Sequence, residues 1–212
     1  MSLIFYYAPM STAIITRAVI DEMGLDCERV KHDLSKGETR TPAFLKINPN
    51  GTVPAIVHDG TAIWESAAIA MYLGDLFGVQ ANLYPAPGPK RGEAMKWITW
   101  SNVRLADAAG RLSAALPAGS EGGVEVAVSA EQRTAEALAT AQKDIAECLR
   151  ILNDALSDKQ FLLGAYTLAD THVQGFVAWL GMMGTELGSY ANISGWLARC
   201  AERPAVAKTM DE

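Results

Sequence analysis

The first 80 residues alternate short apolar runs with amphipathic segments, a pattern typical of strands joined by helices. The run at residues 3–8 is continuously apolar and predicts a buried strand, whereas residues 13–23 show helical periodicity that Gly24 ends. Asp59-Gly60 separates two further apolar runs and suits a two-residue hairpin turn. We therefore expect strands at 3–8, 27–34, 55–58 and 62–64, and helices at 13–23, 43–47 and 66–77.

The predicted order is βαβαββα, in which a helical crossover joins the first strands and a tight turn joins the last two. Such connections predict a mixed sheet covered by helices on both faces, an α/β unit. Later residues have helical periodicity almost throughout, with expected helices at 93–116, 130–156, 168–180 and 193–203. The Gly-rich stretch 117–129 is expected to be a loop, and the second half an all-α helical bundle.

A Pro- and Gly-rich stretch separates the predicted α/β part of the sequence from the predicted helical part. Residues 78–92 contain Pro85, Pro87, Pro89 and several glycines, which a helix interior does not tolerate. We expect an N-terminal domain over residues 1–80, a linker over 81–90 and a helical domain over 91–212.

Composition and charge exclude several classes of function. Half of the 212 residues are apolar, and the net charge of −6 provides no general basic field for nucleic acid or anionic lipid. The chain start has no secretory signal, and no apolar run reaches membrane-spanning length, so we expect a cytoplasmic protein without membrane contact. Its three cysteines form no CxxC pair, and its histidines show no metal-ligand spacing, so we expect neither a dithiol reductase nor a metal site.

The most informative stretch is residues 48–60, Asn-Pro-Asn-Gly-Thr-Val-Pro-Ala-Ile-Val-His-Asp-Gly. Pro54 stands directly before an apolar strand, where a missing N–H is normally excluded from a sheet interior. We expect a cis peptide bond after Val53, which would leave the Val53 backbone free to pair with another extended chain.

A second feature lies where a strand meets a helix. Ser66 is placed for an N-cap, where the free N–H groups of the first turn favour a carboxylate, and Glu65 beside it can meet an ammonium group. Together they would recognise an α-amino-acid head. The alternative is that Ser66 only caps the helix and Glu65 only favours its dipole.

These features together resemble the glutathione transferase family. The likeness is carried by FLKINPNGTVPAIVHDGTAIWESAAIAMYL at 44–73, by residues 3–23, and by Leu-Tyr-Pro at 83–85. In the second domain, Phe-Leu-Leu-Gly at 161–164 precedes Thr167-Leu-Ala-Asp170, which predicts a capping box. The resemblance covers the whole chain and implies a thioredoxin-like N-terminal domain, glutathione as co-substrate, no metal, and a homodimer.

The resemblance also implies a glutathione site. Val53 would pair through its backbone with the cysteinyl residue beside cis Pro54, and Glu65 and Ser66 would hold the γ-glutamyl head. The glycyl carboxylate would lie near residues 40–50, where the candidates are Lys46 and Asn50, although a solvated surface role for Lys46 is an equal alternative.

The residue that activates the thiol is left open. Ser11 and Thr12 open the first helix, where a hydroxyl and the positive helix end can stabilise a thiolate, and either could simply cap the helix. In an ungapped comparison, the activating serine of several related classes falls on Met10 and the cysteine of certain bacterial classes on Thr12. The histidine of those bacterial classes falls on Ala106. A one-residue shift recovers Ser11, which we rank first, then Thr12, then the strand tyrosines Tyr6 and Tyr7.

For a second substrate, a mixed stripe recurs at helical spacing early in the second domain. Its members are Trp100, Arg104, Asp107 and Arg111. The stripe could face the cleft, with Met10 as a pliable apolar wall, or serve a dimer interface or solvent.

We therefore predict attack by glutathione thiolate on a small apolar electrophile. Three alternatives on the same fold use glutathione differently: an isomerase, a peroxidase, or a reductase of mixed disulfides. A further alternative is a non-catalytic binding or regulatory protein, against which the intact Glu65 and Ser66 argue.

Overall fold

A single mixed sheet organises the N-terminal part of the computed structural model, which describes residues 2–116 and 134–208. The strand order is β2-β1-β3-β4. The central strand β1 (Leu3–Tyr7) runs parallel to β2 (Glu28–Lys31) and antiparallel to β3 (Ala55–His58). Strand β4 (Thr61–Trp64) pairs with β3 through the Asp59-Gly60 turn, where both residues have positive φ as a two-residue hairpin requires. The predicted mixed sheet is confirmed.

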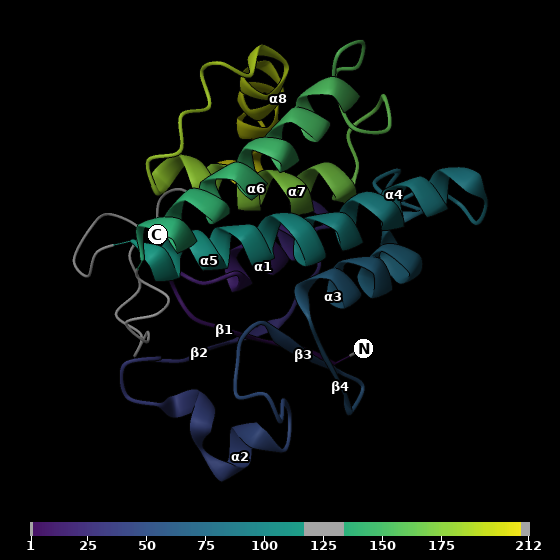
Figure 1. Cartoon of the computed structure of the whole chain (residues 1–212). Helices are drawn as coiled ribbons and strands as arrows, with labels where there is room; N and C mark the ends of the chain where they lie inside the picture. The colour runs from purple at the N-terminus through teal and green to yellow at the C-terminus, as the bar shows by residue number, and fades with distance from the viewer. Residues whose placement is uncertain (1, 117–133, 209–212) are drawn as a thin grey trace.

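Helices cover both faces of this sheet (Figure 1). Helices α1 (Ala13–Glu22) and α3 (Ser66–Leu73) lie on one face, and the short α2 (Pro42–Leu45) lies on the other. Side chains of β1 pack alternately against the helices on the two faces of the sheet, because successive residues of a strand point to opposite faces. Phe5 is completely buried, and Tyr6 packs edge-on against Phe44 of α2 with ring centroids 5.8 Å apart.

The elements described after the sheet are helical, as the sequence predicts. Two segments are π-helical: η2 (Gly74–Gly78) extends α3 at its C-terminal end, and η3 (Ser101–Ala106) joins α4 to α5. A single turn, η1, lies at Glu38–Arg40. The elements of the helical part are α4 (Pro89–Trp100), α5 (Asp107–Ala115), α6 (Ala135–Ala155), α7 (Leu168–Met182), α8 (Ala191–Ala201) and α9 (Pro204–Ala207).

Helix α7 is the core of the helical part and also packs on α1 of the sheet layer. Its start carries the predicted capping box, in which Asp170 accepts the backbone N–H of Thr167 at 2.9 Å. The other Asp170 oxygen accepts the backbone N–H of Leu162 at 2.8 Å and the indole N–H of Trp196 at 2.9 Å. The buried carboxylate thus organises three segments around one helix start.

Some predicted boundaries differ from the structure. Helix α4 begins at Pro89, inside the expected linker, because proline at the first helical position sacrifices no helical hydrogen bond. The predicted helix 66–77 is α-helical only to Leu73 and then π-helical, and the strand predicted at 27–34 pairs only over Glu28–Lys31. The predicted loop 117–129 and the first residues of the helix predicted at 130–156 lie outside the described residues. Across residues 2–116 and 134–208, no helix combines the length and apolarity needed to cross a membrane.

Candidate functional site

The turn between β1 and α1 carries the two candidate thiol-activating hydroxyls. Met10 leads into it with an uncommon positive φ of 52° and a side chain that is 78% exposed. The Ser11 hydroxyl donates to the carbonyl of Ala8 at 2.7 Å and accepts the N–H of Ala13 at 3.2 Å. Thr12 is the residue at the helix N-cap, but its side chain makes no capping hydrogen bond.

A second loop leads into β3 beside this turn. The Val53-Pro54 peptide bond is cis, as the sequence predicts, and Val53 is 8% exposed. Asn48 is buried and supports the loop, because its side-chain amide donates to the carbonyl of Thr52 at 2.7 Å. The Asn48 side-chain oxygen accepts both the backbone and side-chain amides of Asn50, at 3.1 and 3.0 Å. The side-chain amide of Asn50 therefore donates a hydrogen bond within the loop. Lys46, the other candidate for the glycyl carboxylate, is exposed.

The proposed amino-acid-head residues lie at the start of α3. Glu65 is exposed and has φ 71° and ψ 118°, a conformation that non-glycine residues rarely adopt and that concentrates at functional sites. Glu65, rather than Ser66, occupies the N-cap position, so the expectation that Ser66 caps the helix is corrected. Ser66 is the first helical residue and is buried, and its hydroxyl oxygen lies 3.1 Å from the side-chain nitrogen of Asn102.

Asn102 and His172 extend this site into the helical part, and neither was identified from the sequence. Asn102 lies in η3, and its Oδ1 is 2.7 Å from Nε2 of His172 on α7. His172 is completely buried, and this desolvation lowers its pKa to about 3, so its ring is neutral at physiological pH. No sequence motif marks these two residues, because their contact depends on a π-helical segment and on the packing of α7.

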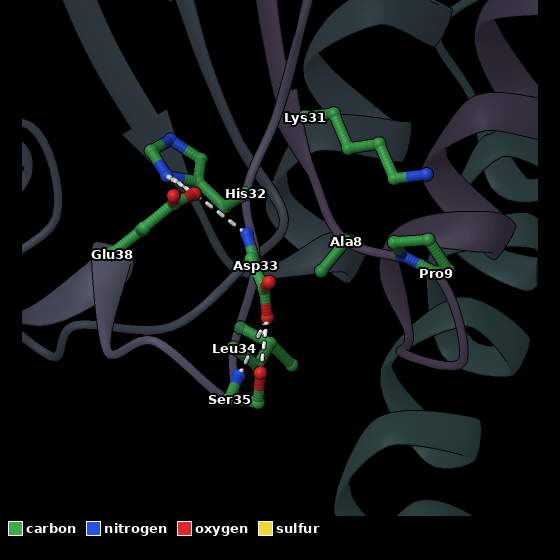
Figure 2. Close-up of a pocket in the computed structure, with 8 residues that line it drawn as sticks. All are labelled: Ala8, Pro9, Lys31, His32, Asp33, Leu34, Ser35 and Glu38. Carbon is green, nitrogen blue, oxygen red and sulfur yellow. Dashed lines mark hydrogen bonds and ion pairs between the residues drawn. The ribbon is translucent and has the colours of Figure 1, made fainter.

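A cavity of about 470 Å³ adjoins the Ala8-Pro9 end of the first turn and the chain that follows β2 (Figure 2). Figure 2 shows the Lys31 side chain extending toward Pro9, while Asp33 turns toward Ser35. Hydrogen bonds from Ser35, together with the ammonium of Lys36, lower the pKa of Asp33 to about 2. The cavity lining is Ala8, Pro9, Lys31, His32, Asp33, Leu34, Ser35 and Glu38.

A second cavity, of about 410 Å³, lies on the other side of the turn, between the start of α1 and α7. Its walls are mostly apolar, and both Ser11 and Thr12 reach it. Apolar walls with few polar groups are typical of sites for small apolar ligands. The wall from the first turn and α1 comprises Tyr7 to Ile15 and Arg17, and the α7 wall comprises Gln174, Gly175, Phe176, Ala178, Trp179 and Met182.

The structure brings only part of the predicted second-substrate set to this cavity. Met10 lines it, whereas Trp100, Arg104 and Asp107 do not. Trp100 packs edge-on against Trp97 with ring centroids 5.3 Å apart. Asp107 lies 3.0 Å from Arg111, which also binds Asp144 at 2.8 Å and so links α5 to α6. Among the residues described, no group of three or more His, Cys, Asp or Glu side chains could hold a metal ion.

Two family models match this chain. Residues 1–75 match the N-terminal domain of glutathione S-transferases, and residues 116–204 match the C-terminal domain of the same proteins. The two matches fall on the sheet-containing half and on the helical half.

Comparison with individual proteins points to the same family. Protein LigF of Sphingobium sp. strain SYK-6 is 40% identical over 98 residues, a match that spans 46% of this chain and 38% of LigF. The solved structure described as the beta-etherase LigF superposes with a TM-score of 0.83 at 27% identity, over 100% of this chain and 99% of that one. Glutathione S-transferase GstB of Escherichia coli K12 is 27% identical over 194 residues, covering 90% of this chain and 88% of GstB.

A fungal structure shares the fold. The glutathione transferase URE2P6 of Phanerochaete chrysosporium, solved with oxidised glutathione, gives a TM-score of 0.86 at 24% identity, over 99% of this chain and 95% of that one.

Proposed function

Because the chain belongs to the glutathione S-transferase family, we propose that it transfers the thiolate of bound glutathione to a small apolar electrophile. The observation that carries this proposal is the apolar cavity whose wall includes the hydroxyl-bearing turn at the start of α1. The cavity would bring the reacting carbon to the same helix end that stabilises the thiolate, and such proximity is a large part of catalysis.

The tripeptide would lie across the ends of the strands. Its ammonium group would meet Glu65, its γ-glutamyl carboxylate would accept a hydrogen bond from Ser66, and its cysteinyl backbone would pair with Val53. The exposed Glu65 carboxylate and the buried Ser66 hydroxyl are adjacent, as recognition of an α-amino-acid head requires.

Activation of the thiol would come from the start of α1. A thiol of pKa about 8.5 is only about 3% ionised at pH 7, and lowering its pKa by two units needs about 2.7 kcal/mol. The Ser11 hydroxyl already donates to Ala8 and accepts from Ala13, whereas the Thr12 hydroxyl caps nothing. This pattern favours Thr12 as the donor to sulfur and Ser11 as the residue that shapes the turn.

The glycyl carboxylate has two candidate cations. The family likeness suggests Lys46 with Asn50, while Lys31 lines the cavity beside Pro9. Lys31→Gln and Lys46→Gln can be compared for binding of glutathione and of its glycinamide analogue. The residue that contacts the carboxylate is the one whose loss weakens glutathione binding but leaves binding of the amide unchanged.

In the proposed reaction, sulfur attacks an electrophilic carbon and a C–S bond forms. The bond from that carbon to its leaving group breaks, and the leaving group takes the electron pair. Trp100, Arg104 and Asp107 lie away from the α1–α7 cavity and remain proposals, either for another part of the second-substrate site or for a contact between subunits.

The likeness to the beta-etherase LigF favours a second candidate, in which the bond that breaks is an ether C–O bond. Thiolate attack on the ether carbon would then give a thioether and an alkoxide or phenoxide, which takes up a proton from water. The cavity of about 410 Å³ has room for one small aromatic group of such a substrate.

The decisive experiment has two arms. Calorimetry should show glutathione binding that weakens by about 1.5 to 3 kcal/mol in Glu65→Ala, as for loss of a hydrogen bond to a charged group, and not in Glu136→Gln at an exposed position of α6. Turnover is then screened over aryl halides, epoxides, peroxides, maleyl compounds and aryl ethers. Binding without turnover of any of them would refute the transferase proposal and favour a binding protein.

A further inference from the structure

Three side chains from different elements form one polar chain behind the start of α3. The Ser66 hydroxyl oxygen lies 3.1 Å from Nδ2 of Asn102, and Oδ1 of Asn102 lies 2.7 Å from Nε2 of His172. The three residues lie on α3, η3 and α7, so these hydrogen bonds join the sheet-containing half of the protein to the centre of its helical half.

The direction of these hydrogen bonds follows from His172. A neutral imidazole carries one proton, and Nδ1 of His172 is buried without a hydrogen-bond partner among the described residues. A proton on Nδ1 would be a buried N–H with no acceptor, whereas a proton on Nε2 has an acceptor at 2.7 Å in Asn102. His172 is therefore the Nε2–H tautomer and donates to Oδ1 of Asn102.

This donation settles the orientation of the Asn102 amide and of the Ser66 hydroxyl. With Oδ1 facing His172, Nδ2 faces Ser66 and donates to its oxygen at 3.1 Å. The reverse bond, from the Ser66 hydroxyl to Oδ1, spans 3.4 Å and ends on an atom that already accepts from His172. The Ser66 hydroxyl therefore does not donate to Asn102, and its hydrogen is free to bond an acceptor other than these side chains.

The backbone of η3 makes this arrangement possible. π-Helical segments are rare and often mark functional sites, because one extra residue per turn changes which side chains face a neighbour. In η3, Ser101 and Leu105 are buried in the core while Asn102 faces the gap between α3 and α7.

We propose that Asn102 and His172 are positioning residues that orient the Ser66 hydroxyl toward the γ-glutamyl carboxylate of glutathione. This inference rests on the proposed glutathione site at Ser66. Neither residue contacts the ligand: His172 orients Asn102, and Asn102 supplies the donor that leaves the Ser66 hydrogen free. The result is a donor already aligned before the ligand arrives, which lowers the ordering cost of binding.

The test compares glutathione with γ-aminobutyryl-cysteinylglycine, which lacks only the α-carboxylate of the γ-glutamyl residue. Asn102→Asp keeps the shape of the side chain but can only accept from Ser66, and Asn102→Ala removes the contact. Both should weaken glutathione binding about tenfold or more in calorimetry, as for loss of a hydrogen bond to a charged group. Both should leave the affinity for the truncated ligand within about twofold, because the group that Ser66 serves is missing.

For His172, the matched pair is His172→Gln and His172→Leu. Glutamine keeps an N–H near the Nε2 position and should preserve glutathione affinity, whereas leucine should lower it as Asn102→Ala does. Equal loss of affinity in the two variants would show that His172 acts by packing and would overturn its positioning role.

Other outcomes are equally informative. Equal weakening for both ligands in the Asn102 variants would mean a general structural effect and would refute the inference, although the glutathione site would stand. No glutathione binding by the unaltered protein would refute the proposed function and this inference together. In ¹⁵N-histidine NMR of the unaltered protein, a protonated Nδ1 on His172 would reverse the chain of hydrogen bonds and also refute the inference.

Discussion

A β-carbon placed on Gly175 of α7 would lie 2.5 Å from Cγ1 of Ile15 on α1, so the two helices meet where only glycine fits. Ile15 is 2% exposed, and its Cγ1 is held by a branched side chain that cannot swing away. This contact joins the two halves of the chain directly beside the α1–α7 cavity, which Gly175 also lines.

Gly175→Ala should therefore destabilise the protein. Overpacking a core contact costs about 1 to 3 kcal/mol, and the better helix propensity of alanine returns only about 1 kcal/mol. In the Ile15→Ala background the clash is absent, so the same glycine replacement should become stabilising. The measurement is chemical unfolding of the four proteins of this double-mutant cycle.

Gly110→Ala on α5 is the matched control, because a β-carbon there meets nothing within 4 Å. It should stabilise the protein by up to about 1 kcal/mol. A stabilising effect of Gly175→Ala in the otherwise unaltered protein would show that α1 and α7 adjust freely at this contact.

The thiol of bound glutathione should titrate with a higher pKa when the Thr12 hydroxyl is removed. Thr12→Ala takes away a donor that makes no capping bond, so the bound thiol pKa should rise by about one unit, equivalent to about 1.4 kcal/mol. Thiolate absorbance across neutral pH measures this in the glutathione complex, and turnover should fall with the thiolate fraction.

Ser11→Ala is the comparison, because it removes bonds to Ala8 and Ala13 that shape the turn. It should lower thermal stability more than Thr12→Ala and move the thiol pKa less. A larger pKa shift in Ser11→Ala would restore Ser11 as the main activating residue. No shift in either variant would place activation in backbone N–H groups or a tyrosine.

Asp170→Ala should be among the most destabilising single changes in the helical part. It leaves the N–H groups of Leu162, Thr167 and Trp196 buried without their acceptor, at about 1 to 3 kcal/mol for each unsatisfied donor. Thr167→Ala should cost only about 0.5 to 2 kcal/mol, because it disturbs the cap alone. Denaturant titration measures both, and equal losses would contradict this ranking.

The buried His172 should make stability depend on pH. Burial lowers its pKa to about 3 in the folded protein, against about 6.5 in the unfolded chain. Between these pH values His172 is protonated in the unfolded chain and neutral in the folded protein. Protonation of this residue should therefore lower the free energy of unfolding by about 1.4 kcal/mol for each pH unit between about 6.5 and about 3. His172→Gln should lack this component, and identical pH slopes for the two proteins would contradict it.

The protein should be a homodimer, as the family resemblance implies. Large exposed apolar side chains occur on successive elements from β4 to η3, among them Trp64, Leu76, Met95 and Val103, the last 63% exposed. Sedimentation at micromolar concentration should give twice the chain mass of 22.7 kDa. Val103→Glu should favour the monomer and Leu34→Glu, at another exposed apolar position, should not; a monomeric unaltered protein would contradict the expectation.

Several features of both halves could be predicted because their signals are local. The Asp59-Gly60 turn, the proline at the start of β3 and the Thr167–Asp170 cap each depend on residues a few positions apart. Backbone sterics and hydrogen-bonding periodicity act over this range, so the order of strands and helices follows from the sequence alone.

Residues that must meet across the fold could not be predicted in this way. Asn102 reaches Ser66 over a separation of 36 residues and His172 over 70, and no spacing rule connects such positions. The hydroxyl of Ser11 is a local case: the sequence places it at a helix start, but the conformation of the turn decides that it donates to the carbonyl of Ala8. The sequence by itself determined the order of strands and helices and the family. Only the tertiary structure decided where the apolar cavity lies and which side chain contacts Ser66, because both depend on contacts between segments distant in the chain.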